Sequence, residues 1–528
     1  MVPPRPAPSS PWAPLRHRVF RSLWVAQLAS NVGTWMQNVG AAWLMGDVHG
    51  TPTQVALIQT ATSLPVFVVG LAAGAIADVV DRRRLLLATQ AWMLLVAGLL
   101  ALTTALGAVR PVTLLLMTFA LGLGAALNLP AWQAIQPELV PRDELPRAVA
   151  LGAMSMNLGR SVGPAVGGAL VAASGPAAVF GINALSFVGV LVALIAWRRP
   201  HERDELPPER LLNALRAGVR YAQHSPALRA VLVRAALFTM PASAMMALLP
   251  VVSRDRLHLG SGGFGALFAC VGAGAVAAAF VVPHAQARGV DRTILAASVM
   301  IGTALAGMAA LHEPIALAPL LVVGGAGWTA GFSTFNVSAQ SVLPAWVRAR
   351  GMGLYVLVIQ GGLAIGSATW GTVAARSTGA ALGVPAGLVV VATWSSATRW
   401  RLTRKEQLDL RVSSYWPEPV LEVEVDPDRG PVLITVEYRV PEPNRARFTD
   451  AMRKVQRMRR RTGARRWGLY QDSADPERYV ETFVVDSWEE HLRQHQRTTA
   501  ADELAHGAAK AFLAPGTAVR TSHLLWAY

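Results

Sequence analysis

Twelve apolar stretches, each about as long as a helix needs to cross a lipid bilayer, fill the chain up to Trp400. A spanning helix needs about 20 mostly apolar residues, and a chain with many such stretches is restricted to a helical membrane protein. A polar segment separates six stretches from six. The predicted spans are Leu23–Met45, Val55–Ala77, Leu85–Leu106, Val112–Ala131, Ala148–Val171, Ala177–Trp197, Leu228–Val252, Phe264–Pro283, Ile294–Leu311, Ile315–Phe335, Met352–Ala375 and Ala380–Ala397.

The positions of the arginines orient these spans. With the N-terminus inside, cytoplasmic segments hold roughly six times as many arginines and lysines as outside loops, as the positive-inside rule requires. Both termini are therefore expected on the cytoplasmic side of a bacterial inner membrane. Much of the formal charge of +16 is then explained by the arginines and lysines that orient the spans, which argues against a nucleic-acid partner. One cysteine, Cys270, excludes an intrachain disulfide framework and any Cys-rich metal site.

The composition changes after Trp400, where charged residues become dense and strand patterns begin. We therefore predict an all-α polytopic membrane protein with twelve transmembrane helices in two six-helix bundles, followed by a small α+β ferredoxin-like domain. The predicted divisions are a disordered cytoplasmic tail (1–18), an N-terminal bundle (19–198), a cytoplasmic central loop (199–227), a C-terminal bundle (228–400), a linker (401–430) and a cytoplasmic ferredoxin-like domain (431–528).

The short loop after the second span, GAIADVVDRRRLLLA, combines acidic and basic residues at helix ends. An aspartate facing arginines there forms a charge lock that breaks when bundles move. An ordinary cytoplasmic loop obeying the positive-inside rule explains the arginines equally well. The candidate residues of this loop are Gly74, Asp78, Asp81, Arg82 and Arg83. PHAQARGVDRTILAA, at the matching place in the second half, is a fainter copy and favours an internal duplication.

The fifth span carries the stretch LGRSVGPAVGGAL. Glycines spaced four residues apart share one helix face and allow another backbone to approach, and the proline bends the helix. A small-residue packing face without directional meaning is the alternative. The candidate residues are Gly159, Arg160, Gly163, Pro164, Gly167 and Gly168.

Arg160 is the unusual residue of this stretch, because a charge at mid-membrane costs several kcal/mol unless it faces water or a partner. We expect it to face a central cavity or an acid. Nearby acids are few: Asp47, Asp78 and Glu138. Its partner is left open between Asp47, a substrate carboxylate and water.

Amides and aromatic residues inside the spans mark a candidate substrate cavity. Asn31, Trp35 and Asn38 fall at i, i+4 and i+7 on one helix face. Helix–helix packing explains each such residue singly. Together they favour an uncharged or anionic organic substrate. The candidate cavity residues are Asn31, Trp35, Asn38, Asn128, Asn157, Arg160, Asn336 and Gln360.

These two motifs resemble those of the major facilitator superfamily. Gly74, Asp78, Arg82 and Arg83 fall on its loop motif, with departures at Val79 and Asp81 that leave the ion-pair partners open. The fifth-span stretch resembles its Gly-x-x-x-Gly-Pro-x-x-Gly-Gly motif, typical of exporters and antiporters. The residues from Phe20 to Trp400 resemble the transmembrane secretion effector, or enterobactin-exporter-like, subfamily. The resemblance implies proton coupling, although the first half offers no mid-membrane carboxylate.

The C-terminal segment predicts the order βαββαβ and resembles the dimeric α/β-barrel domains of the antibiotic-biosynthesis monooxygenase type. The resemblance implies dimerisation through this domain. Trp467, Tyr470 and Trp488 are candidates to line a pocket, while His491 and His495 lack a third metal ligand and are interpreted as a solvated helix face. We expect a regulatory or dimerising module without metal or cofactor; a cofactor-free oxygenase is the minority interpretation. The basic segment Arg453–Arg466 is expected near anionic lipid.

The sequence therefore predicts a secondary active exporter, not an enzyme, that moves a siderophore, drug or secondary metabolite by alternating access with proton antiport. Its expected partners are a small-molecule substrate, protons and the lipid bilayer. The alternatives are a membrane-anchored monooxygenase-like enzyme and an importer or lipid flippase of the same fold.

Overall fold

The computed structural model describes Ser10 and residues 12–141, 143–197, 211–402, 426, 429–517 and 519–526; within these, the side chains of residues 71–72, 74–79, 211–217, 345, 349 and 496 are not described. Most of the predicted tail and linker, and residues 199–210 of the predicted central loop, therefore lie outside the described residues. The chain divides into two compact units. The first, the helical unit, holds residues 1–208, 233–336 and 355–401; the second, the α/β unit, holds residues 209–232, 337–354 and 402–528.

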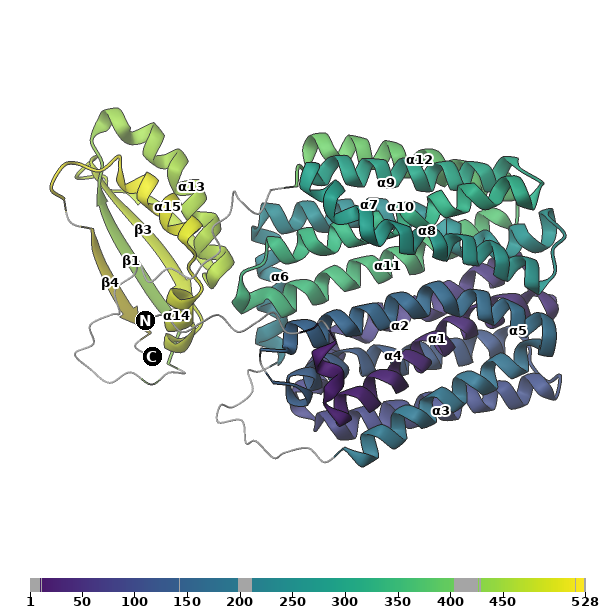
Figure 1. The fold of residues 1–528 in the computed structure, drawn as a ribbon. Coiled ribbons are helices and arrows are strands. Elements are labelled where there is room, and N and C mark those ends of the chain that lie inside the picture. Colours follow the sequence, from purple (N-terminus) through teal and green to yellow (C-terminus); the bar gives the residue numbers. More distant parts are fainter. Residues whose placement is uncertain are drawn as a thin grey trace. The chain divides into compact units, whose positions relative to one another are not determined.

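The helical unit is built from two groups of helices, shown in purple to blue and in teal to green in Figure 1. A short 3-10 turn, Ala13–Arg16, precedes the first group, which comprises α1 (Arg18–Asp47), α2 (Pro52–Val79), α3 (Arg82–Ala105), α4 (Pro111–Leu139) and α5 (Leu145–Ala196). The second group comprises α7 (Pro226–Val251) with a π-helical turn η2 (Val252–Arg256), α8 (Ser261–Arg288), α9 (Val290–Ala310), α10 (Pro314–Ser341), α11 (Arg348–Ala374) and α12 (Thr378–Arg399).

Helix α5 supplies two spans in one continuous element. It has 52 residues, and Gly175 adopts φ 77°, a left-handed conformation that glycine tolerates and that turns the chain before Pro176. Ten described helices, α5 among them, are long and apolar enough to cross a membrane. With α5 counted as two spans, these helices contain eleven of the twelve predicted spans; the twelfth prediction, Leu23–Met45, falls in the more polar helix α1.

The surface of the helical unit is the surface of a membrane protein. Large apolar side chains are exposed on several helices, among them Leu95, Leu106, Leu185, Phe280 and Ile315. Soluble monomers rarely expose apolar residues on this scale, so these faces are suited to hydrocarbon.

The α/β unit contains the predicted ferredoxin-like domain. Its elements are β1 (Val432–Arg439), α13 (Arg445–Thr462), β2 (Arg466–Gln471), β3 (Arg478–Val485), α14 (Trp488–Gln496), α15 (Ala500–Lys510) and β4 (Arg520–Leu525). The sheet is antiparallel with the order β2-β3-β1-β4. The predicted βαββαβ order is confirmed, with one difference: the second helix is divided in two because a capping box at Thr499 starts a new helix, α15.

One face of this sheet packs against the helices. Along β1 the buried residues alternate with half-buried ones, and Val432, Ile434, Val436 and Tyr438 point into a core shared with Phe448. The same unit also contains α6 (Leu211–His224), the end of α10, the turn η3 (Ala345–Val347) and the start of α11.

Candidate functional site

Arg160 lies in the first half of α5 and reaches a helix of the other group. Its Nη2 atom donates to Asn157 Oδ1 at 2.9 Å and to Thr329 Oγ1, on α10, at 3.5 Å. Its Nε atom is buried without a hydrogen-bond partner. Among the ion pairs of the described side chains, none involves Arg160. A half-buried guanidinium with spare donors between two helix groups is suited to hold an anionic or strongly accepting group.

The acids considered as partners for Arg160 lie elsewhere. Asp47 pairs with Arg254 at 3.0 Å, and Glu138 pairs with Arg82 at 3.0 Å. Asp47 is therefore not the partner of Arg160 in this structure. The side chain of Asp78 lies outside the described part.

The structure does not bring all the candidate cavity residues together. Asn31, on α1, donates to Ser155 Oγ at 3.0 Å and lies beside Gly159, so it packs against the stretch of α5 that carries Asn157 and Arg160. Asn128 instead accepts from Thr89 and Gln90, both at 3.2 Å, and ties α3 to α4. Trp35 packs by its Cβ against Gly163, while Asn38, Asn336 and Gln360 are half-buried in α1, α10 and α11. The sequence missed Thr329 because a single threonine in an apolar helix carries no signal.

The glycines of α5 allow two different close contacts. A Cβ at Gly159, Gly163 or Gly167 would lie 2.6–2.9 Å from atoms of α1, in the same group. A Cβ at Gly168 would instead overlap Gly265 Cα, on α8 of the other group. Gly159, Gly163 and Gly167 therefore pack α5 within its own bundle, while Gly168 makes a contact between the bundles.

At the end where α1 passes into α2, the α1–α2 end, contacts join the two groups. Arg254, in η2, pairs with Asp47 and lies over the Trp43 ring at 5.4 Å. The Trp43 ring stacks on Phe264, of α8, with centroids 5.9 Å apart. Thr53, at the start of α2, donates to Gly371 O of α11 at 3.1 Å. This end of the helical unit is therefore closed, apart from a cavity of about 120 Å³ lined by residues that include Ala42, Val55 and Val251.

At the opposite end, the α2–α3 end, the polar contacts of the loop motif stay within one group. Asp81 caps α3 by accepting from Arg84 N at 2.9 Å, and Arg82 pairs with Glu138 of α4. Arg83 donates to Leu194 O at 2.9 Å and to Ile195 O at 3.0 Å, which caps the end of α5. The surroundings of Gly74 and the side chain of Asp78 lie outside the described part.

The fainter copy of this loop in the second half also carries a charge contact. Arg234 of α7, almost fully buried, pairs with Asp291 at the start of α9 and donates to Trp400 O at 3.2 Å. These helices all belong to the second group. The two loop motifs therefore brace their own bundles, while the contacts at the α1–α2 end link one bundle to the other.

The Asp47–Arg254 pair is expected to contribute modestly to this closure. Both side chains are nearly 40% exposed, so water screens the pair and we expect about 0.5–1 kcal/mol. In a C270A background with A42C as a reporter cysteine, D47N should increase labelling by a membrane-impermeant maleimide about two- to fivefold. The exchange D47R/R254D should restore slow labelling, and equal labelling in all variants would contradict the assignment.

Buried polar residues hold the core of the C-terminal domain together. Glu481, fully buried, accepts from Arg459 Nε and Trp467 Nε1 at 2.9 Å each and from the Tyr438 hydroxyl at 2.7 Å. Trp488 is buried in the core, whereas Tyr470 is 62% exposed. Trp467, Tyr470 and Trp488 therefore do not line one pocket.

The interpretation of the histidines as a solvated helix face is wrong for His491, which is fully buried. Its ring lies 4.7 Å from those of His495 and His523 between centroids, and both of its nitrogens lack a hydrogen-bond partner. His523 comes from β4, so sequence spacing gave no sign of it. Burial, reinforced by the neighbouring imidazoles, lowers the pKa of His491 to about 3, and burial lowers the pKa of His495 to about 4. The described residues hold no group of three or more such side chains arranged to bind a metal ion.

These histidines should make the C-terminal domain sensitive to acid. Their folded pKa values lie below the unfolded value of about 6.5, so the unfolded state binds more protons between about pH 6.5 and 3. The contribution of these neutral histidines to the free energy of unfolding is fully present above about pH 6.5. It falls as the pH drops, by up to about 1.4 kcal/mol per pH unit for each histidine. Thermal unfolding of the domain in the full-length protein at pH 7 and pH 5 measures this loss. H491F should flatten the profile, and a wild-type profile already flat over this range would refute the prediction.

The two groups of long apolar helices, joined by contacts at the α1–α2 end, have the architecture of a membrane transporter of the major facilitator type. The chain belongs to the transmembrane secretion effector family, whose model matches residues 9–527. It is 27% identical over 372 residues to the enterobactin exporter EntS of Escherichia coli O1:K1 and 28% identical over 370 residues to that of Citrobacter koseri; each alignment covers 69% of this chain and 86% of the relative.

Solved transporters share the fold at low sequence identity. The nucleoside transporter NupG, studied as a mutant, superposes with a TM-score of 0.60 at 12% identity, covering 72% of this chain and all of that one. A bacterial homologue of the iron transporter ferroportin in an inward-facing state gives 0.58 at 15% identity, covering 72% of this chain and 98% of that one. These similarities confirm the fold.

Proposed function

We propose that the protein is a secondary active exporter that moves a small organic molecule across the bacterial inner membrane by alternating access, in exchange for protons. The substrate is an anionic or strongly hydrogen-bonding compound of the siderophore, drug or secondary-metabolite class. Both termini lie in the cytoplasm, so the α1–α2 end faces outward and the α2–α3 end faces inward.

The environment of Arg160 is the observation on which this proposal mainly rests. Its guanidinium lies between the two bundles, has no acidic partner among the described residues and keeps a buried donor unused. An isolated cation in such a place is costly, and its cost is offset when an anion binds. A carboxylate or catecholate group satisfies this requirement, and a simple hydrocarbon does not.

The contacts between the two bundles at the α1–α2 end are consistent with the proposed direction of transport. The contacts of Asp47, Thr53 and Gly168 with the second bundle all lie toward the α1–α2 end. With that end outward, Arg160 is reached from the cytoplasm, where a metabolite for export is made. The relatives named as enterobactin exporters support both export and the siderophore class.

Proton coupling rests on the family resemblance. In the described part of the helical unit, the carboxylates of Asp47, Glu138, Asp255 and Asp291 lie at helix ends. The proposal is tested by measuring uptake into inverted vesicles for a panel of siderophores, drugs and lysolipids. Each compound is measured with and without an imposed pH gradient, because proton coupling has to be tested separately. Uptake of an anionic siderophore that requires an acidic lumen supports the proposal. Uptake in the opposite orientation alone, or of lysolipid alone, would overturn it.

The C-terminal domain also has a surface suited to a second copy of the chain. The helices of the domain pack on one sheet face, while Thr435, Val480 and Thr482 lie half-buried on the other, with Leu524 exposed. Dimerisation through this face is proposed, and the mass of the detergent-solubilised protein tests it.

A further inference from the structure

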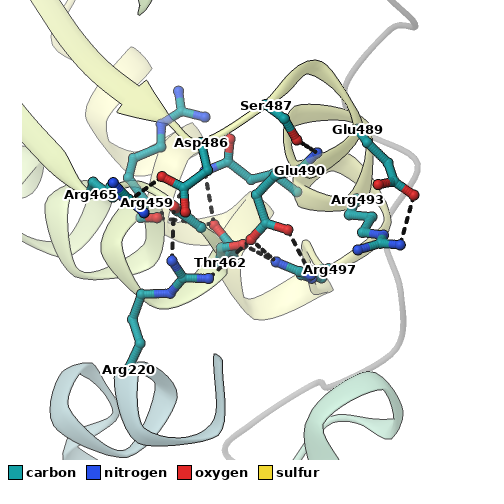
Figure 2. Close-up of polar contacts among 12 residues, drawn as sticks. Arg220, Arg459, Thr462, Arg465, Asp486, Ser487, Glu489, Glu490, Arg493 and Arg497 are labelled. Atoms are coloured by element: carbon teal, nitrogen blue, oxygen red, sulfur yellow. Dashed lines mark hydrogen bonds and ion pairs between the residues drawn. The ribbon is translucent and has the colours of Figure 1, made fainter. Parts of the chain in front are cut away.

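Helix α6, between the two helix groups in sequence, is joined to the C-terminal domain through Arg220. Its Nη2 atom donates to Glu490 Oε1 at 3.0 Å (Figure 2). Its Nη1 atom donates to Gly463 O at 3.2 Å. Gly463 directly follows α13, and Glu490 lies in the first turn of α14. One side chain of α6 is thus bonded to two elements of the domain.

Glu490 is positioned for this contact by its own domain. Arg497 donates from Nη1 to Glu490 Oε1 at 2.6 Å and from Nη2 to Oε2 at 3.1 Å (Figure 2). The exposed fractions of the side chains are 20% for Arg220, 15% for Glu490 and 7% for Arg497. Because these charges are sheltered from water, the contact is screened less than an ordinary surface pair.

The residue after Arg220 extends the contact to the connection between α10 and α11. Tyr221 is 2% exposed, and its hydroxyl donates to Val342 O at 3.1 Å. Its ring meets that of Trp346, in η3, edge to face at 5.8 Å. Two arginines of the domain cover these rings: Arg461 lies 5.6 Å from the Tyr221 ring and Arg497 lies 4.8 Å from the Trp346 ring. Cation–π contacts of this kind favour a fixed arrangement.

We call this set the α6 clamp; it consists of Arg220, Tyr221 and Trp346 on one side and Arg461, Glu490 and Arg497 on the other. The clamp holds segments that continue into three helices of the second group. Helix α7 begins directly after α6, α10 ends just before Val342, and α11 begins directly after η3. The same ends must shift if the α2–α3 end closes during transport.

We propose that the C-terminal domain is a regulatory latch that acts through the α6 clamp. The clamp stabilises the state with the α1–α2 end closed, and its release favours the opposite state. The latch rests on the proposed alternating-access function. It gives the domain a role that requires no catalysis, since a change in the domain alters the equilibrium between the two transporter states.

The test measures the conformational equilibrium without substrate. Full-length protein in a C270A background carries A42C, whose position lines the cavity at the α1–α2 end. R220M removes the α6 side of the clamp and leaves the internal contacts of the domain intact, and E490Q weakens the other side. E489Q is the matched control, because Glu489 pairs within α14 with Arg493.

R220M and E490Q should each increase the rate of labelling by an impermeant maleimide from outside about fivefold, with E489Q unchanged. Labelling in R220M equal to that in E489Q would overturn the latch, even if E490Q differs, because E490Q also loosens Arg497. Transport is measured in parallel. If the variants transport substrate and their labelling is unchanged, the latch is contradicted and the proposed function is not. If labelling shifts but the protein transports no compound of the panel, the proposed substrate class is contradicted and the latch is not.

Discussion

Replacing Arg160 with alanine is expected to reduce export about 10- to 100-fold, while the protein still inserts and folds. A hydrogen bond to a charged group contributes about 1.5–3 kcal/mol, and the guanidinium has donors free for such a bond to a substrate. Removal of Arg160 leaves no buried acid unpaired, since its described partners are the neutral side chains Asn157 and Thr329. The loss should therefore fall on transport and not on stability.

R160K is the informative control. It keeps the charge but loses the planar fork, so an anionic substrate should retain part of its transport. Uptake into inverted vesicles gives the rate, and the amount of inserted protein normalises it. Full activity of R160A would remove Arg160 from the substrate path.

The second large effect is expected at Gly168. A leucine there has no room, because even a Cβ would overlap the Gly265 backbone of the other bundle. Overpacking costs about 1–3 kcal/mol, so G168L should reduce the population with a closed α1–α2 end about ten- to hundredfold. A transporter held away from one of its two states cannot complete a cycle, and export should be lost.

The matched control lies in the same helix. Gly181 has no atom within 4 Å of a Cβ position, so G181L adds an equal side chain without a contact between bundles. G181L should transport normally. Labelling of A42C should be faster in G168L than in G181L, and equal labelling would show that Gly168 does not separate the two states.

The twelve spans followed from hydrophobic length, because the bilayer imposes the same requirement on every crossing helix. The ferredoxin-like order followed from alternating and amphipathic patterns such as that of β1. The turn within α5 lies at Gly175 and Pro176, between the predicted spans Ala148–Val171 and Ala177–Trp197.

The contacts that give the site its properties could not be predicted in this way. Asp47 and Arg254 are 207 residues apart in the sequence, which left the partner of Arg160 open between Asp47, a substrate carboxylate and water. His523 joins His491 through the sheet, and Arg220 meets Glu490 across most of the C-terminal half. Such pairs depend on tertiary packing, which the local periodicity of hydrophobic residues does not predict. Local motifs did identify the α5 glycines, but only the structure separates Gly168 from the three that pack within the bundle.

Substrate uptake into inverted vesicles with an acidic lumen, compared among wild type, R160A and G168L, tests the central claim most directly. We expect wild type to take up an anionic siderophore at least about tenfold faster than both variants, and to lose this uptake when the pH gradient is collapsed. Equal uptake by wild type and R160A, or uptake only in right-side-out vesicles, would contradict it.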